Sequence, residues 1–272
     1  MKKHTVDLFS DYRLKHKIGK GTFGEVWSAI NIETREKVAI KMSTTPKGPA
    51  IMLAEYNVMN SLDHPNIMKA SAIYHSAVSA HIVMPFYEAD LFNYTMDNEG
   101  LLKEKTLKVI LNDICGAIKH THDKDIVHRD IKPENIMMDG NCKFVLCDFG
   151  FAEKEDYMTT SKLLGTLAFL SPELIKGMHR DNEAKFTVGK PVDIYALGIT
   201  LFCIATKTNG VPEFLSTKKL MRYLEDPDMQ DEVDKLKNRS EKFKSLLRGM
   251  LDPNPISRIT IDEIISHEFF CE

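Results

Sequence analysis

The hydrophobic pattern of the chain changes near residue 87, and no other feature constrains the fold as strongly. Residues 12–73 contain short apolar runs separated by glycines, which predict strands, and one helical pattern that begins near Pro49. Beyond residue 87, apolar residues recur at three- and four-residue spacing, which predicts helices at residues 101–122, 192–205, 242–251 and 261–269. The sequence therefore predicts an α+β fold, with a small β-rich lobe containing one main helix and a larger, mostly helical lobe.

A proline-containing segment, Met84-Pro85-Phe86-Tyr87-Glu88, separates the two patterns, because proline continues neither a helix nor a central strand. We therefore interpret this segment as the connection between the lobes. The predicted boundaries are a short N-terminal extension at residues 1–11 and one domain at residues 12–272, with lobes at about 12–84 and 90–272 and a hinge at about 85–89.

Length and composition limit the possible functions. With 272 residues, of which 43% are hydrophobic, the chain can bury a full core and a second lobe. Its formal net charge of −3 shows neither the basic excess of nucleic-acid-binding proteins nor an acidic tail, so we expect no nucleic-acid partner. The five cysteines are odd in number and irregularly spaced, which favours reduced thiols and an intracellular location over a disulfide framework.

A membrane partner is not expected either. The first ten residues are charged and lack the apolar core of a signal peptide. The longest apolar stretch, residues 192–205, contains Asp193, Tyr195 and Thr200 and is shorter than the roughly 18–20 residues that a membrane span needs. This stretch is therefore predicted to be a helix buried inside the protein.

Three glycines punctuate the first predicted hairpin, in Ile18-Gly19-Lys20-Gly21-Thr22-Phe23-Gly24-Glu25-Val26. Because glycine has no side chain, backbone amides there can approach phosphates closely. Alone, the pattern is weak, since a glycine-rich hairpin without a ligand and a dinucleotide-binding strand-to-helix turn are alternatives. The second alternative is disfavoured, because residues 25–42 predict two further strands and no helix.

A lysine and a glutamate in the first lobe are expected to form an ion pair. Lys41 ends the apolar strand Val38-Ala39-Ile40-Lys41, and its compact charge suits the α- and β-phosphates of a nucleotide, although a solvated strand end is the plainer alternative. Glu55 lies within the apolar stripe of the following helix, between Ile51 and Val58. A carboxylate on a buried face needs a partner, and Lys41 is the available cation.

Two loops in the second half of the chain carry groups suited to metal and hydroxyl chemistry. In His128-Arg129-Asp130-Ile131-Lys132-Pro133-Glu134-Asn135, which proline breaks, Asp130 can orient a hydroxyl and Asn135 can offer an oxygen to a metal. Asp148-Phe149-Gly150 follows a second apolar strand, and a carboxylate at a strand end is a natural site for Mg²⁺. The sequence therefore predicts two metal ligands and one candidate base.

Taken in this order, the motifs closely resemble those of the eukaryotic protein kinases. The resemblance covers roughly residues 12–270. Further matches are Ser171-Pro172-Glu173, Asp193 with Gly198, and Arg258, which is expected to pair with Glu173. The resemblance implies the bilobal protein kinase fold and Mg²⁺-dependent transfer of the γ-phosphate of ATP to hydroxyl groups of proteins.

The resemblance also implies a role for each matching residue. The catalytic residues would be Asp130, which positions the substrate hydroxyl, Lys132, which neutralises the transferred phosphoryl group, and the pair Lys41 and Glu55. ATP would be bound by Ile18, Gly19, Gly21, Gly24, Val26, Ala39, Lys41, Met84, Met137 and Asp148. Of these, Ala39 and Met137 would sandwich the adenine, and Met84 would be the gatekeeper. Asn135 and Asp148 would hold Mg²⁺.

Substrate specificity is a further implication of the resemblance. Lys132 and Thr166 resemble the serine/threonine branch, and Phe151 is typical of members that prefer serine to threonine, so we expect protein substrates with serine acceptors. Residues at substrate-contacting positions of the family are Leu163, Leu167 and Leu170 for a following apolar residue, and Glu134 and Asp90 for an upstream arginine. No sequence feature fixes the oligomeric state, and we expect a monomeric catalytic domain.

Some positions depart from the family pattern. Ser171 replaces alanine, Tyr195 replaces tryptophan, and residues 178–190 resemble an insert whose role the sequence does not predict. None of these positions carries a catalytic group. A pseudokinase scaffold is the alternative from a different functional class, and it is disfavoured because the residues that such proteins usually lose, Lys41, Asp130 and Asp148, are present.

Two hypotheses concern the segment after Gly150. In the first, a phosphate pairs with Arg129 and activates the protein, and the candidate acceptors are Thr159, Thr160 and Ser161. In the second, activity is constitutive because nearby carboxylates already supply negative charge, and these are Glu153, Glu155 and Asp156. The sequence leaves both hypotheses open.

Overall fold

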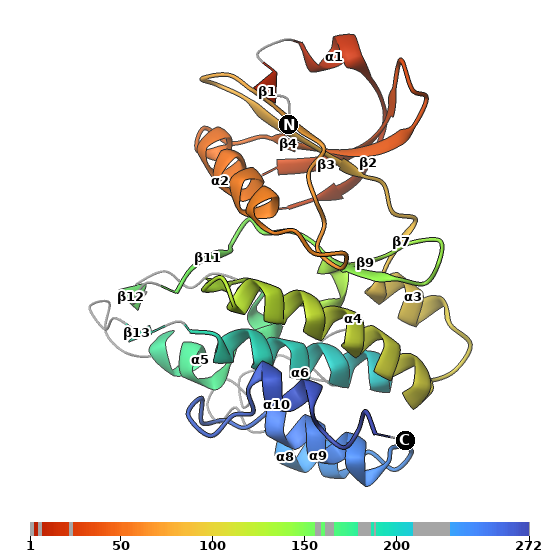
Figure 1. The fold of residues 1–272 in the computed structure, drawn as a ribbon, viewed down its shortest axis with the longest axis vertical. Helices are drawn as coiled ribbons and strands as arrows, with labels where there is room; N and C mark the ends of the chain where they lie inside the picture. The colour runs from red at the N-terminus through yellow and green to blue at the C-terminus, as the bar shows by residue number, and fades with distance from the viewer. Residues whose placement is uncertain are drawn as a thin grey trace. The chain divides into compact units, whose positions relative to one another are not determined.

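The computed structural model describes residues 3–4, 7–21, 24–155, 159–160, 166–178, 186–187, 189–208 and 229–271. The chain separates into two compact units (Figure 1). The first consists of Met1–Glu88 and Leu146–Gly150, and the second of Ala89–Val145 and Phe151–Glu272. The first unit is built on a β-sheet and the second mainly on helices, which confirms the predicted α+β fold class.

As far as the structure describes the first unit, its sheet has six strands in the order β1-β5-β6-β4-β3-β2. Their bounds are Lys3–His4 (β1), Tyr12–Lys20 (β2), Gly24–Asn31 (β3), Lys37–Ser43 (β4), Ala72–His75 (β5) and Ala80–Pro85 (β6). Neighbours from β5 to β2 pair antiparallel, whereas β1 runs parallel to β5. The predicted glycine-rich hairpin is therefore the β2–β3 pair, and β6 ends at the proline expected to close the lobe.

The segment that the sequence assigned to an N-terminal extension contributes to the core of the first unit. Helix α1 spans Leu8–Asp11, and Leu8 is buried in a cluster with Tyr12, Tyr74 and further residues of the sheet. The rings of Tyr12 and Tyr74 meet edge to face at a centroid distance of 6.0 Å. The Tyr74 hydroxyl donates a hydrogen bond to the carboxylate of Asp11. Residues 8–12 are thus fixed to the sheet by apolar and polar contacts.

Helix α2, Gly48–Ser61, is the main helix of the first unit and begins at the predicted place. Pro49 lies in its first turn, where the missing N–H costs no helical hydrogen bond. Its buried side includes Met52, Tyr56 and Met59, together with the carboxylate of Glu55. The helix therefore packs its apolar side into the core while it holds one buried charge there.

In its described residues, the second unit contains helices, two 3₁₀ turns and short strand pairs. Its elements are β7 (Ala89–Asp90), α3 (Leu91–Asp97), α4 (Glu104–His122), β8 (Ile126–Val127), η1 (Pro133–Asn135), β9 (Ile136–Met138), β10 (Phe144–Leu146), β11 (Glu153–Lys154), β12 (Thr159–Thr160), η2 (Leu167–Phe169), α5 (Pro172–Met178), β13 (Phe186–Thr187), α6 (Pro191–Thr206), α8 (Gln230–Asp234), α9 (Glu241–Met250) and α10 (Ile261–Ile265). The strands form small sheets ordered β10-β9-β7, β11-β8 and β12-β13.

The predicted helices are found as α4, α6, α9 and α10, and α10 is shorter than predicted. It ends at Ile265. The Ser266 hydroxyl donates to the Asp262 carbonyl oxygen, and in the following turn the His267 ring accepts the backbone N–H of Phe269. Every residue from 192 to 205 in α6 is buried. In the part of the chain that the structure describes, no helix has the length and apolar character to cross a membrane.

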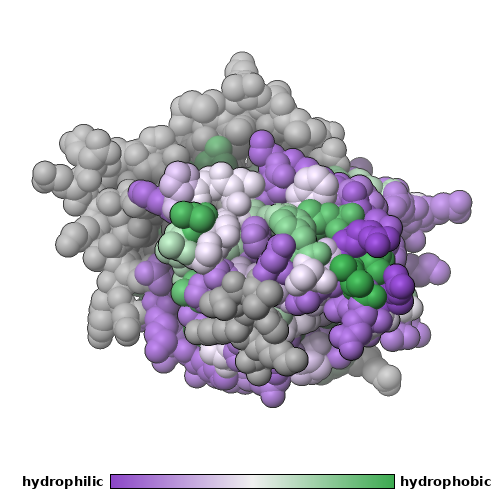
Figure 2. All heavy atoms as spheres, turned by 90° about the horizontal axis from the view of Figure 1, so that it is seen from above, coloured by the Kyte–Doolittle hydropathy of each residue, from purple (hydrophilic) through white to green (hydrophobic). Residues whose placement is uncertain are grey.

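The surface drawn in Figure 2 carries hydrophobic residues in separate groups, each bordered by hydrophilic or neutral residues. Scattered apolar groups of this kind are ordinary on folded proteins.

Candidate active site

In the first unit, one buried cation meets two carboxylates. Lys41 comes from β4, Glu55 from α2, and Asp148 follows β10. The Lys41 Nζ atom lies 2.7 and 2.8 Å from the two carboxylate oxygens of Glu55 and 2.8 Å from Oδ1 of Asp148. The side chains of Lys41 and Glu55 are buried, whereas that of Asp148 is 37% exposed. The ion pair predicted from the apolar stripe of α2 is therefore present, with Asp148 as a second partner.

Burial and charge together set the pKa values of this group. Burial lowers the pKa of the Lys41 ammonium, but attraction by Glu55 and Asp148 outweighs it and holds that pKa well above its usual range. For Glu55, burial raises the pKa, Lys41 lowers it and Asp148 raises it again, with a net pKa of about 7. The lysine therefore stays charged, while the two carboxylates compete for it.

The backbone around Asp148 is adapted to this cluster. Asp148 itself has a φ of 59°, in the left-handed region, which few residues other than glycine adopt and in which aspartate is tolerated better than most. Gly150 lies against the ion group: a Cβ atom there would be 3.2 Å from Oδ1 of Asp148, 3.4 Å from Glu55 and 3.6 Å from Lys41. A side chain at position 150 would therefore crowd the three charged groups, and glycine avoids this contact.

The glycine-rich segment lies where β2 ends and β3 begins. Gly19 is opposite Val26 in the sheet, and the Gly21 N–H donates to the Gly24 carbonyl oxygen at 2.8 Å. A Cβ atom at Gly24 would collide with the Met42 carbonyl oxygen, so this position requires glycine. Residues 22–23 lie outside the described residues. Ile18, also expected at the nucleotide, is 44% exposed.

The three residues expected around the adenine come from different elements. Ala39 in β4 and Met84 in β6 are direct cross-strand partners, and both are buried. Met137 is in β9 of the second unit, where it pairs with Asp90 of β7 and is partly buried. Within the first unit, the structure thus brings Ala39 and Met84 together.

In the second unit, the carboxylate of Asp130 collects four hydrogen bonds. Its Oδ2 accepts from Lys132 Nζ at 2.8 Å and from Asn135 Nδ2 at 3.0 Å. Its Oδ1 accepts from the backbone N–H and the hydroxyl of Thr166, at 3.0 and 2.9 Å. Lys132 also donates to the Thr166 hydroxyl at 2.7 Å. The predicted residues Asp130, Lys132 and Asn135 therefore form one cluster, to which Thr166 adds two hydrogen bonds.

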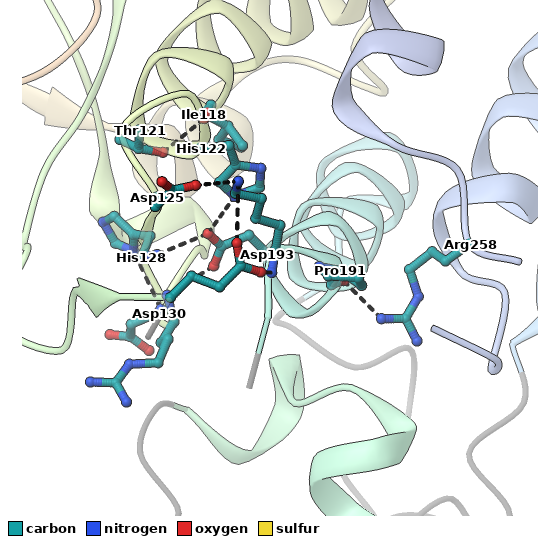
Figure 3. A network of polar contacts seen from close by, with 12 residues as sticks. Ile118, Thr121, His122, Asp125, His128, Asp130, Pro191, Asp193 and Arg258 are labelled. Atoms are coloured by element: carbon teal, nitrogen blue, oxygen red, sulfur yellow. Dashed lines mark hydrogen bonds and ion pairs between the residues drawn. The ribbon is translucent and has the colours of Figure 1, made fainter. Parts of the chain in front are cut away.

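A buried carboxylate on α6 fixes the backbone just before Asp130 (Figure 3). Asp193 accepts hydrogen bonds from the backbone N–H groups of His128 and Arg129, both at 2.8 Å, and lies 2.9 Å from Nε2 of His122. Burial raises the pKa of Asp193, but the bond and the charge interaction with His122 outweigh it and hold the pKa below its usual value. Arg129, with a φ of 68°, is strained, and these bonds hold it there.

Sequence reasoning did not identify the contact between His122 and Asp193. The structure buries His122 against Asp193, 71 residues away in the sequence. A pairing this distant leaves no local pattern, and the only available signal is its place at the end of α4 shortly before His128.

The residues expected to contact substrate are placed as follows. Glu134 in η1 is exposed, while Asp90 is the N-cap of α3 and accepts from the backbone N–H of Asn93 at 2.7 Å. Leu170 is buried, and Leu167 is partly buried at the start of η2. Leu163 and Ser161 lie outside the described residues, as does most of the insert at 178–190.

The metal ligands predicted from the sequence, Asn135 and Asp148, are isolated oxygen donors in the structure. Among the described residues, no group of three or more His, Cys, Asp and Glu side chains is arranged to hold a metal ion. Asn135 uses its amide nitrogen in both of its bonds to Asp130, which leaves its side-chain oxygen to coordinate. Asp148 offers a partly exposed carboxylate. Such sparse oxygen donors suit Mg²⁺, which usually keeps waters and substrate phosphates as further ligands.

Comparisons with known proteins agree with this geometry. The model of the protein kinase domain family matches residues 12–270. The chain is 29% identical to the serine/threonine-protein kinase AtPK1/AtPK6 of Arabidopsis thaliana, over 96% of this chain and 55% of that protein. It is 30% identical to CBL-interacting protein kinase 12 of Oryza sativa, over 97% of this chain and 48% of that protein.

A mouse relative, the serine/threonine-protein kinase DCLK3, is 29% identical over 97% of this chain and 33% of its own length. The chain thus spans about half, or less, of the length of these curated relatives. The family match covers nearly all of the chain and includes both charge clusters. The chain therefore belongs to the protein kinase domain family, in its serine/threonine branch.

Proposed function

We propose that this chain transfers the γ-phosphate of ATP to serine and threonine hydroxyl groups of proteins, in a reaction that depends on Mg²⁺. The observation that carries the proposal is the cluster of Lys41, Glu55 and Asp148. In this cluster Glu55 fixes the position of the Lys41 ammonium group, which also contacts Asp148, a carboxylate suited to bind a metal. A buried lysine with two acidic partners and a strongly shifted pKa is typical of functional sites, which supports a catalytic role.

The residues present fit Mg²⁺ and ATP. Lys41 would hold the phosphates of ATP, and its raised pKa keeps it protonated for that purpose. Asn135 and Asp148 would hold Mg²⁺ through hard oxygen ligands. When bound, Mg²⁺ would neutralise negative charge on the phosphate oxygens. Gly19, Gly21, Gly24, Ile18 and Val26 would cover the nucleotide, and Ala39, Met84 and Met137 would contact its base.

In the second cluster, Asp130 would orient the substrate hydroxyl and accept its proton. Its carboxylate is held in one orientation by Lys132, Asn135 and Thr166, so no reorganisation is needed when the hydroxyl binds. The ammonium of Lys132 would offset the charge of the transferred phosphoryl group. Catalysis would therefore consist mainly of positioning and charge neutralisation.

The expected substrates are proteins in which serine is preferred to threonine as the acceptor. Phe151, which follows Gly150 directly, supports this preference through the family resemblance. The exposed carboxylate of Glu134 supports a moderate preference for an upstream arginine. We further propose a monomeric catalytic domain in an intracellular, reducing compartment, where the exposed free thiols of Cys142 and Cys271 would stay reduced.

A transfer assay with labelled ATP and a mixed serine and threonine peptide library tests the proposal. The wild-type protein should label peptides in the presence of Mg²⁺ and lose this activity when EDTA removes the metal. Asp148→Asn should not label peptides above background. A wild-type protein that binds ATP but transfers no phosphate would support the pseudokinase alternative, for which no observation in the described residues argues.

A further inference from the structure

A carboxylate attaches the segment after Gly150 to the strand before Asp130. Glu153 begins β11, which pairs antiparallel with β8, so Glu153 lies opposite Val127. Oε2 of Glu153 accepts a hydrogen bond from Nη2 of Arg129 at 2.8 Å. The Nε of Arg129 donates to the carbonyl oxygen of Phe151. The guanidinium that precedes Asp130 thus already has an anionic partner from this segment.

A second carboxylate attaches the same segment to the start of α6. The backbone N–H of Glu155 donates to the Asp125 carbonyl oxygen at 2.7 Å. The Glu155 carboxylate accepts from the backbone N–H of Lys190 at 3.0 Å and lies 3.2 Å from its Nζ. That ammonium also lies 2.7 Å from the carboxylate of Asp125, which Figure 3 labels. Glu155 therefore places negative charge at the N-terminus of α6, where the helix dipole favours it.

The contact at α6 is closely packed. Lys190 is the N-cap of α6 and makes no side-chain capping bond of its own. A Cβ atom at Gly189 would lie 2.9 Å from Oε1 of Glu155, a distance that would force the carboxylate to move. The glycine therefore permits Glu155 to reach the helix.

Burial makes Glu153 important to Arg129. Only 6% of the Arg129 side chain is exposed, and burial lowers its pKa while the charge of Glu153 opposes that effect. A buried guanidinium without a carboxylate is unfavourable. Because Arg129 is also held in a strained backbone conformation directly before Asp130, losing its partner would loosen the loop that carries Asp130.

We propose that Glu153 and Glu155 are positioning residues that hold this segment, and through Arg129 the adjacent Asp130, without phosphorylation of the chain. The proposal rests on the proposed kinase function and defines its regulation. Of the two hypotheses for this segment, the proposal favours constitutive activity, in which carboxylates anchor the segment. It disfavours activation by a phosphate on the candidate acceptors Thr159, Thr160 and Ser161. Of these, Ser161 lies outside the described residues.

Activity measurements form the first arm of the test. Phosphatase-treated wild type, checked by mass spectrometry, should keep at least half of its kcat for peptide phosphorylation. Glu153→Gln should lower kcat by about 5- to 30-fold, the effect of one or two lost interactions of moderate strength, with the KM for ATP nearly unchanged. Glu153→Asp keeps the charge and should recover part of the loss. Asp234→Asn, which removes a carboxylate paired with the exposed Arg248 at 2.6 Å, is the matched control and should leave kcat unchanged.

Hydrogen exchange forms the second arm and does not depend on activity. Glu153→Gln and Glu155→Gln should each accelerate amide exchange in residues 126–129 and 153–155, and Asp234→Asn should not. Unchanged exchange in both glutamine variants would overturn the proposal, as would a tenfold or greater loss of wild-type activity on phosphatase treatment. If the wild-type protein transfers no phosphate at all, the proposed function fails, and the exchange results still decide whether the carboxylates anchor the segment.

Discussion

Arg258 and Glu173, which are 85 residues apart, form a two-pronged ion pair with N–O distances of 2.8 and 2.9 Å. The Arg258 side chain is fully buried and lies 4.9 Å from the centre of the Tyr195 ring. It also donates to the carbonyl oxygens of Pro191 and Asp252, at 2.7 and 2.9 Å. The planar guanidinium thus joins α5, the start of α6 and the loop before α10.

Replacing Arg258 by lysine should lower the free energy of unfolding by about 1–3 kcal/mol, because lysine keeps the charge but cannot form both bonds to Glu173 and reach the two carbonyl oxygens. Urea unfolding measures this change. Arg248→Lys is the control, since its exposed pair with Asp234 should contribute less than about 1 kcal/mol. Equal losses of unfolding free energy in the two variants would show that the buried Arg258–Glu173 pair stabilises the fold no more than the exposed pair does.

Asp130→Asn and Asp148→Ala should each lower kcat by at least about 100-fold, because each removes a carboxylate with a proposed role in the transition state, Asp130 in orienting the substrate hydroxyl and Asp148 in holding Mg²⁺. Circular dichroism should show a folded protein in both cases. Asp262→Asn, an exposed carboxylate paired with Lys119, controls for the loss of charge. Turnover near that of the wild type in either active-site variant would contradict the assigned roles.

The carboxyl group of Glu55 should titrate near pH 7 in the nucleotide-free protein. Because its folded-state pKa is raised from 4.5, the folded state binds the proton more tightly between these values, so the free energy of unfolding should fall as the pH rises from about 4.5 to 7. Carbon NMR of labelled glutamate follows the titration, and Glu55→Gln assigns the signal. Asp148→Asn should lower the pKa, since the charge of Asp148 raises it. An ordinary glutamate pKa in both proteins would exclude this coupling.

Asp193→Asn should accelerate amide exchange at His128 and Arg129 and lower the free energy of unfolding by about 1–3 kcal/mol, because an amide has one acceptor oxygen where the carboxylate has two. Since the pKa of Asp193 is lowered from 3.8, its stabilisation is complete above pH 3.8 and is lost as the pH falls through the lowered value. Asp97→Asn, at an exposed position, is the control. Unchanged exchange at both amides would show that Asp193 does not hold the backbone of this loop in place.

A positional peptide library should show serine preferred to threonine, an apolar residue favoured directly after the acceptor, and a moderate preference for arginine three residues before it. Burial of the apolar residue should contribute at most about 1.5–3 kcal/mol. Glu134→Gln should weaken the selection for arginine and leave the other two preferences unchanged. Dominant threonine phosphorylation, a strict requirement for a following proline, or selection for acidic upstream residues would contradict the proposed substrate groove.

Sequence patterns predict what is local in this protein. The place of Glu55 within the apolar stripe of its helix was sufficient to predict the pair with Lys41, and the long apolar run at 192–205 predicted a buried helix. The short helices α3, α5 and α8 were not predicted, because segments of five to seven residues show less than two turns of periodicity. The contact of His122 with Asp193 depends on distant segments meeting, which no pattern within one element records.

The packing of Leu8 has a practical consequence for where a shortened protein can begin. The family match starts at residue 12, and a protein cut there would lose Leu8, which is 3% exposed, and Asp11, whose carboxylate accepts the hydrogen bond from Tyr74. Removing a buried leucine side chain costs about 2–5 kcal/mol, a large part of the stability of a small domain. A shortened version of this catalytic domain should therefore keep residues 7–11, because they contribute to the core, even though the family match begins after them.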